Sequence, residues 1–168
     1  MQGRDITHKL LFEWDLAALA AALHIPPADV EIYFRDGRRI SFVLERRIRD
    51  SFDGWHLAPS EGAGYDLVDD RGEKWEVRSV SNSIYFCPSY MVGSGRKFDE
   101  SGFFRKLDTI DGYICSDITT FPKVPVYVIP SDLIRRLYVD GKLGPTTLIR
   151  RAKFYSMVVP ELDAIDSR

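Results

Sequence analysis

Two carboxylates and one guanidinium lie in a short acidic segment, and their types suit metal-assisted hydrolysis of a phosphodiester. Residues 64–81 read GYDLVDDRGEKWEVRSVS, so Asp66 precedes Glu76 by ten positions and Arg78 follows Glu76 by two. Carboxylate oxygens are the ligands that Mg²⁺ prefers, and a fixed cation stabilises the charge that develops on a phosphate. These three residues are therefore candidates for a single site.

The segment between the two acids predicts a β-hairpin that brings them together. Residues 66–68 and 75–78 alternate as half-buried strands do, and the sequence DDRG between them is a turn signal. If the loop is Asp70-Arg71-Gly72, with Gly72 in the left-handed conformation, Asp66 faces Glu76 on the same side of the sheet. Opposed cross-strand residues sit roughly 5 Å apart, so these like charges favour a divalent cation between them.

The same hairpin also fits an interpretation without chemistry. Aspartate and glycine are common in turns for conformational reasons alone. Lys74, Glu76 and Arg78 alternate with Trp75 and Val77, so the three charged residues also suit a solvated strand face. The remainder of the chain has to separate the two interpretations.

Length, composition and charge indicate one ordinary globular domain that spans residues 1–168. The chain is 45% apolar and 29% charged, with a formal net charge of −2 that argues mildly against a pure nucleic-acid-binding module. Cys87 and Cys115 lack the spacing of metal ligands, so we interpret them as small buried groups in a reducing compartment. No signal peptide is recognisable, and the apolar run from Leu16 to Leu23 is too short for a membrane span. We expect a cytoplasmic protein without membrane contact.

The apolar pattern predicts an α/β fold, with a mixed sheet flanked by helices. A helical N-terminal extension is expected over residues 1–39, and the core over residues 40–160. Ser41 is the expected cap of the helix that precedes the hairpin. The expected helices are 10–24, 41–52, from 101 to about 110, and 131–138; the expected strands are 113–118, 124–129 and one or two within 146–159. We expect 28–34 to be a short helix or strand, 82–95 to be irregular and 161–168 to be loose.

Glu45 lies beside the apolar stripe of the predicted helix 41–52. That stripe consists of Ile40, Leu44, Ile48 and Phe52. An acid at the margin of a buried face usually points outward or pairs with an arginine. The alternative is that Glu45 points toward the carboxylates of the hairpin.

The order of these elements resembles the PD-(D/E)XK nuclease superfamily, which includes many type II restriction endonucleases. A helix with an acid precedes an acidic hairpin, and a helix, two strands and a further helix follow. The hairpin pattern is Asp66…Glu76-Val77-Arg78, and the resemblance covers about residues 40–130. It implies a restriction endonuclease-like core and hydrolysis of phosphodiester bonds in double-stranded DNA.

The resemblance also implies roles for individual residues. Asp66, Glu76 and the carbonyl of Val77 would ligate Mg²⁺, with Mn²⁺ as a possible substitute, and Glu45 would hold a metal-bound water. Arg78 stands where the superfamily has a lysine. Arginine does not give up its proton at working pH, so Arg78 can stabilise a phosphate but cannot deprotonate water.

The departure at Arg78 leaves deprotonation of the attacking water to the metal or to a second group, for which Lys74 and Lys97 are candidates. Lys74 lies on the same strand face as Glu76, and Lys97 lies in a flexible stretch, Gly93-Ser94-Gly95-Arg96-Lys97, that would have to fold over the site. The remaining possibility is that activity is reduced or lost. The DNA contacts expected from charge and position are Arg96, Lys97, Lys74, Asn82 and Tyr85.

Three functions therefore compete at the level of the sequence. The first is a Mg²⁺-dependent restriction-type endonuclease, a homodimer if it cuts both strands, with a structure-specific junction or mismatch nuclease as a variant. The second is a catalytically weak or inactive DNA-binding module on the same fold. The third is a small α/β protein that binds other proteins through its aromatic surface.

Overall fold

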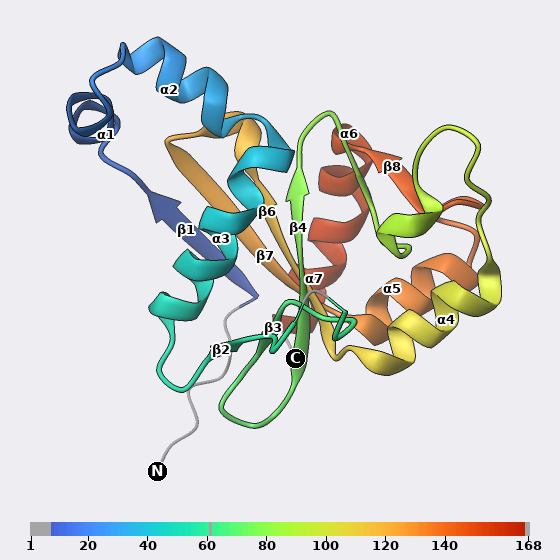
Figure 1. The fold of residues 1–168 in the computed structure, drawn as a ribbon. Coiled ribbons are helices and arrows are strands. Elements are labelled where there is room, and N and C mark those ends of the chain that lie inside the picture. The colour runs from blue at the N-terminus through green and yellow to red at the C-terminus, as the bar shows by residue number, and fades with distance from the viewer. Residues whose placement is uncertain (1–7, 61, 167–168) are drawn as a thin grey trace.

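A six-stranded mixed sheet forms the centre of the molecule, with helices on both faces (Figure 1). The computed structural model describes residues 8–60 and 62–166. In spatial order the strands are β1 (Lys9–Glu13), β7 (Lys123–Pro130), β6 (Gly112–Asp117), β4 (Lys74–Val80), β3 (Leu67–Val68) and β2 (His56–Leu57). β4 runs parallel to β6, and the other neighbouring strands of this sheet are antiparallel. The predicted α/β class, with a mixed sheet and flanking helices, is confirmed.

One face of the sheet is covered by α3 (Gly37–Ser51), which carries the predicted apolar stripe. Ile40, Leu44 and Ile48 have no exposed surface, and their spacing of four residues places them on one side of the helix. The helix begins four residues earlier than predicted, so Ser41 lies inside it and is not its cap. The start of the helix lies close to β4. A Cβ atom at position 37 would be only 2.6 Å from Oγ of Ser79, so the glycine permits this close approach.

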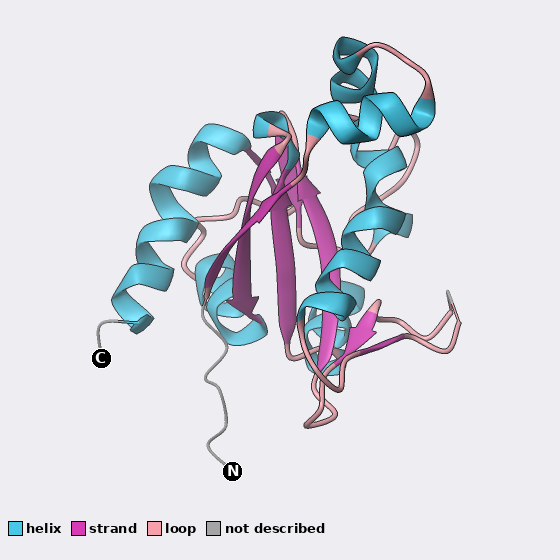
Figure 2. Ribbon diagram, turned by 90° about the vertical axis from the view of Figure 1, so that its left-hand side faces the viewer, coloured by secondary structure: helices cyan, strands magenta, loops and turns pink. Residues whose placement is uncertain are grey.

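The other face is covered by α4 (Glu100–Thr109), α5 (Ser131–Val139) and the C-terminal helices. Figure 2 shows the sheet edge-on between these helices and α3. The second apolar cluster joins Phe103 and Leu107 of α4 to Leu133 of α5 and to the strands β4, β6 and β7. Cys87 and Cys115 are buried free thiols within it, as predicted.

The predicted helix over residues 10–24 is only half correct. Lys9–Glu13 forms β1, which pairs antiparallel with β7 at the edge of the sheet. The helices that follow are α1 (Leu16–Leu23) and α2 (Pro27–Phe34). Residues 1–39 are therefore not a purely helical extension. Phe12 is 6% exposed and Leu11 is 60% exposed, which is the alternation of a half-buried strand.

The predictions for the C-terminal segment are mostly wrong. Within 146–159 there is one short strand, β8 (Leu148–Arg150), which pairs with β5 (Ser83–Tyr85) in a separate two-stranded sheet. A helical run follows through α6 (Arg151–Lys153), a π-helical segment (Phe154–Val158) and α7 (Val159–Asp166). Residues 161–166 are thus helical and not loose, since Phe154, Val158 and Leu162 are buried at helical spacing. Among residues 8–60 and 62–166, no helix has the length and apolarity that a membrane span requires.

Candidate functional site

The hairpin forms with the predicted register and places Asp66 beside Glu76. Val68 pairs with Lys74 and Leu67 with Trp75, which is the predicted register; Asp66 directly precedes the last of these pairs and Glu76 directly follows it. The loop is the predicted one, with Gly72 at a φ of 83°. The N–H of Asp66 donates to the Trp75 carbonyl over 2.9 Å, and Oδ2 of Asp66 accepts 2.7 Å from the N–H of Val77. The side chain of Asp66 is thereby fixed against the strand that carries Glu76.

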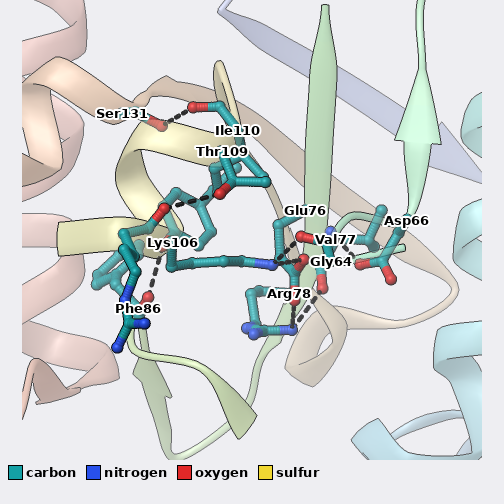
Figure 3. Close-up of polar contacts among 12 residues, drawn as sticks. Gly64, Asp66, Glu76, Val77, Arg78, Phe86, Lys106, Thr109, Ile110 and Ser131 are labelled. Carbon is teal, nitrogen blue, oxygen red and sulfur yellow. Dashed lines mark hydrogen bonds and ion pairs between the residues drawn. The ribbon is translucent and has the colours of Figure 1, made fainter. Parts of the chain in front are cut away.

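Glu76 is nearly buried, and two cations compensate its charge. Its side chain is 9% exposed; Oε1 lies 2.6 Å from Nη1 of Arg78, and Oε2 pairs with Nζ of Lys106. Figure 3 shows Lys106 extending from its helix to Glu76, with Arg78 on the other side of the carboxylate. A carboxylate with so little exposure requires such compensation, because removing an unpaired charge from water is costly.

Lys106 was not identified as a site residue from the sequence. It lies on α4, whose N-terminus is capped by Asp99 through hydrogen bonds from the N–H groups of Ser101 and Gly102. Its Nζ also donates to the Gly64 carbonyl over 2.7 Å, and its side chain is only 11% exposed. The sequence gives only a weak indication of this role. Lys106 belongs to one of several groups of basic residues, and thirty residues separate it from Glu76.

Arg78 lies at the centre of the site and is held by several contacts. Besides Glu76, its Nη1 donates to the Val77 carbonyl over 3.3 Å, and its guanidinium lies over the Tyr85 ring at 5.0 Å from the centroid. Burial by itself would lower the pKa of Arg78, but the nearby Glu76 carboxylate raises it above its ordinary value. The guanidinium is therefore a fixed cation that does not exchange protons.

Asp66 is held in an environment that disfavours its charged form. Burial, and then the negative charge of Glu76, raises the pKa of Asp66 above the ordinary 3.8, against the opposing hydrogen bond from Val77. A carboxylate with a raised pKa beside a second carboxylate favours the uptake of a cation or a proton. Such perturbed groups in a cavity are frequent at functional sites.

These side chains line an open cavity of about 510 Å³ between the hairpin and α4. Asp66, Glu76, Arg78 and Lys106 all contribute to its wall, as does Tyr65. A second cavity of about 500 Å³ shares Tyr65 and Asp66 with it, and contains Glu45. The structure thus places Glu45 next to the site, across Asp66 from Glu76, where Oε2 of Glu45 also lies 3.9 Å from Nη1 of Arg46.

The other predicted residues are distributed around the site and not all within it. Tyr85 and Arg96 line a third cavity that adjoins Arg78. Lys74 points to Tyr65, with its Nζ 5.3 Å from the ring centroid. Asn82 and Lys97 are exposed, and neither is among the described residues that line these three cavities.

The donor set fits a hard divalent cation that keeps water ligands. Asp66, Glu76 and the Val77 carbonyl supply oxygen atoms along one strand edge, and Mg²⁺ binds through one or two carboxylates together with waters. Within the described part of the chain, no group of three histidine, cysteine, aspartate or glutamate side chains could enclose a metal. A cation at this place would therefore have to bind through the two carboxylates and the carbonyl, with waters as its other ligands. Because both oxygens of Glu76 already contact cations, a metal would have to share this carboxylate with Lys106 and Arg78.

Comparison with known proteins gives no relative from which function could be transferred. The chain matches no protein-family model, no curated protein and no solved structure. Function therefore has to be argued from the geometry of the site.

Proposed function

We propose that this protein is a Mg²⁺-dependent endodeoxyribonuclease with a PD-(D/E)XK-type site. The observation that carries the proposal is the convergence of Asp66, Glu76 and Lys106 on one cavity wall. Two acids and a lysine from separate elements are the groups that metal-assisted phosphodiester hydrolysis needs. The order α3, hairpin, α4, β6, β7, α5 agrees with the order on which the resemblance rests.

Each side chain of the cavity has a role in this proposal. Asp66, Glu76 and the Val77 carbonyl would hold Mg²⁺, which when bound supplies a polarised phosphate and a more acidic water. Arg78 keeps its charge and stabilises the negative charge on the phosphate oxygens. Lys106 takes the role that the sequence left open between Lys74 and Lys97: once its ammonium has released a proton to solvent, the amine can accept the proton of the attacking water, whereas a guanidinium stays protonated.

Cleavage of both strands of double-stranded DNA would require two such sites, and a homodimer would supply them by symmetry. Type II restriction activity is the form of the proposal that the resemblance favours. Glu45, across Asp66 from Glu76, would orient a water at the margin of the site.

A second candidate function is a catalytically inactive DNA-binding module on the same fold. The observation that favours it is the pairing of both Glu76 oxygens with Arg78 and Lys106, which satisfies this carboxylate without a metal. In that case magnesium would neither bind to the site nor change the stability of the protein.

The experiment is a cleavage assay on plasmid and phage DNA in Mg²⁺ or Mn²⁺. We expect the wild type to cut, and Asp66→Asn and Glu76→Gln to lose at least about a hundredfold in rate. Asp70→Asn is the matched control, because Asp70 is an exposed carboxylate in the turn of the same hairpin. Absence of cleavage by the wild type in either metal, with DNA binding that divalent ions do not change, would favour the binding module.

A further inference from the structure

A third cavity, of about 730 Å³, adjoins the candidate site and has a different character. It contains six serines and two arginines, Arg78 and Arg96, and none of the described residues that line it is acidic. Arg78 and Ser89 also line the cavity of Asp66 and Glu76, so the two hollows are neighbours. We refer to the third cavity as the serine groove. Hydroxyl groups and guanidinium groups without carboxylates form a surface that suits a phosphate.

The serine groove follows an edge of β4 that β3 does not cover. β3 pairs only with Lys74 and Trp75, whereas β4 continues to Val80 and pairs with β6 on its other side. The N–H of Val77 points to the uncovered side, where it donates to Asp66. Alternate residues of a strand direct their backbone groups to the same side, so the N–H of Ser79 points into the serine groove as well.

Arg78 presents a donor at this location that lacks an acceptor. Its side chain is 13% exposed, and its Nε is buried without a hydrogen-bond partner among the described residues. Its Nη1 is already engaged by Glu76 and the Val77 carbonyl. Buried donors are nearly always satisfied, so the unpaired Nε leaves this guanidinium with unused hydrogen-bonding capacity in a residue that lines both cavities.

The glycine-containing loop predicted from the sequence contributes to the lining of the serine groove. Gly93 and Ser94 line it, and Gly93 has a φ of 122°, which a residue with a side chain rarely adopts. Arg96 is anchored to the same region, since its Nη1 donates to the Ser89 carbonyl over 2.8 Å. The serine groove is therefore lined by the edge of β4 and by Arg96, which its hydrogen bond to the Ser89 carbonyl holds in place.

We propose that the serine groove binds the phosphate of the nucleotide adjacent to the one that is cleaved. This inference rests on the proposed function, and it narrows the substrate to a polynucleotide strand that spans at least two phosphates. The strand would run from Glu76 past Arg78 to Arg96, with one backbone phosphate in each hollow. A small phosphodiester would fill the catalytic cavity alone and would not reach the groove.

The test compares two substrates in Mg²⁺, an oligonucleotide and the small diester bis(p-nitrophenyl) phosphate. Ser81→Asp adds a negative charge to the serine groove, and Arg96→Ala removes a positive one. The matched controls are Ser156→Asp and Arg136→Ala, at exposed positions on the C-terminal helical run and on α5. For each protein, the quantity measured is the ratio of kcat/KM on the oligonucleotide to kcat/KM on the small diester.

We expect that ratio to fall about tenfold in Ser81→Asp and severalfold in Arg96→Ala, as loss of a phosphate contact predicts, and to stay constant in both controls. An unchanged ratio in Ser81→Asp and Arg96→Ala would overturn the proposed groove and leave the nuclease proposal intact. Absence of hydrolysis of either substrate by the wild type would instead overturn the nuclease proposal. Fluorescence anisotropy with a labelled oligonucleotide would then test phosphate binding in the serine groove. Weaker binding by Ser81→Asp than by the wild type would support it, and equal binding would refute it.

Discussion

Lys106 of α4 and Glu76 of β4 form a nearly buried ion pair at the wall of the candidate site, although thirty residues separate them. The pair joins the helix that follows the hairpin to the hairpin itself. It also supplies a cation that can lose its proton, next to Arg78, which cannot. The proposed hydrolytic role of the hairpin depends on this relationship.

The two members of this pair should contribute unequally to stability. Glu76→Gln leaves Lys106 and Arg78 without the carboxylate that both contact, and we expect it to lower the free energy of unfolding by about 3 kcal/mol or more. Lys106→Met leaves Glu76 paired with Arg78, so we expect a smaller loss of about 1–3 kcal/mol. Urea denaturation measures both, with Asp108→Asn, at an exposed ion pair, as a control expected to cost under about 1 kcal/mol. A Glu76→Gln variant more stable than the wild type would contradict this account.

Asp66 should destabilise the fold at neutral pH. Its pKa is raised in the folded protein, so the folded state binds a proton more tightly than the unfolded state does. The contribution of Asp66 to stability is then fully present below the ordinary value of 3.8 and is lost as the pH rises through the folded pKa. We expect Asp66→Asn to be more stable than the wild type at pH 7, with a difference that shrinks below pH 3.8. Paired urea titrations across this range measure it, and a variant less stable at pH 7 would show that Asp66 is structural.

Asp117 should have the opposite effect to Asp66 on the pH dependence of stability. It is fully buried at the end of β6 and accepts hydrogen bonds from Arg151, Tyr155 and Thr119. Burial opposes its charge, but these donors together hold the pKa of Asp117 below 3.8. Its contribution is therefore present above pH 3.8 and is lost as the pH falls through the folded pKa.

We expect Asp117→Asn to lower the free energy of unfolding by about 1–3 kcal/mol at pH 7, because Arg151, Tyr155 and Thr119 lose a charged hydrogen-bond acceptor. The deficit should diminish in acid, and the same urea titrations measure it. Equal stability of Asp117→Asn and wild type at pH 7 would refute this role for Asp117.

Magnesium should stabilise the folded protein through the hairpin carboxylates. A ligand at ten times its Kd adds about 1.4 kcal/mol to the free energy of unfolding. The ammonium of Lys106 competes with the metal for Glu76, so we expect Lys106→Met to bind Mg²⁺ more tightly, by up to about tenfold. Thermal denaturation over a Mg²⁺ series measures this, with KCl at matched ionic strength as control. Equal effects of the two salts would contradict the proposed site.

The hairpin and α3 could be predicted from the sequence, because local patterns of residues determine both elements. The DDRG turn and its alternating flanks predicted the register that places Asp66 beside Glu76. The helical stripe of α3 was likewise legible from Ile40, Leu44 and Ile48. These features depend on periodicity and turn chemistry within about fifteen residues.

Tertiary contacts decided the features that the sequence did not predict. Lys9–Glu13 is a strand because it pairs with the edge of β7. Its apolar alternation was not recognised, because the alanine-rich helix that follows extends the helical pattern over it. The C-terminal β-branched residues become helical because Phe154, Val158 and Leu162 pack against the sheet. Lys106 is recognisable only after folding, since its partner Glu76 lies on another element.

The most direct test of the central claim is plasmid cleavage in Mg²⁺ by wild type, Lys106→Met and Lys106→Arg, with the folded state of each verified by thermal denaturation. The account predicts that the wild type cleaves, and that both variants remain folded but lose about two to four orders of magnitude in rate. Lys106→Arg distinguishes a proton-accepting amine from a mere positive charge. Wild-type cleavage that persists undiminished in both variants would contradict the assignment of Lys106 to the site.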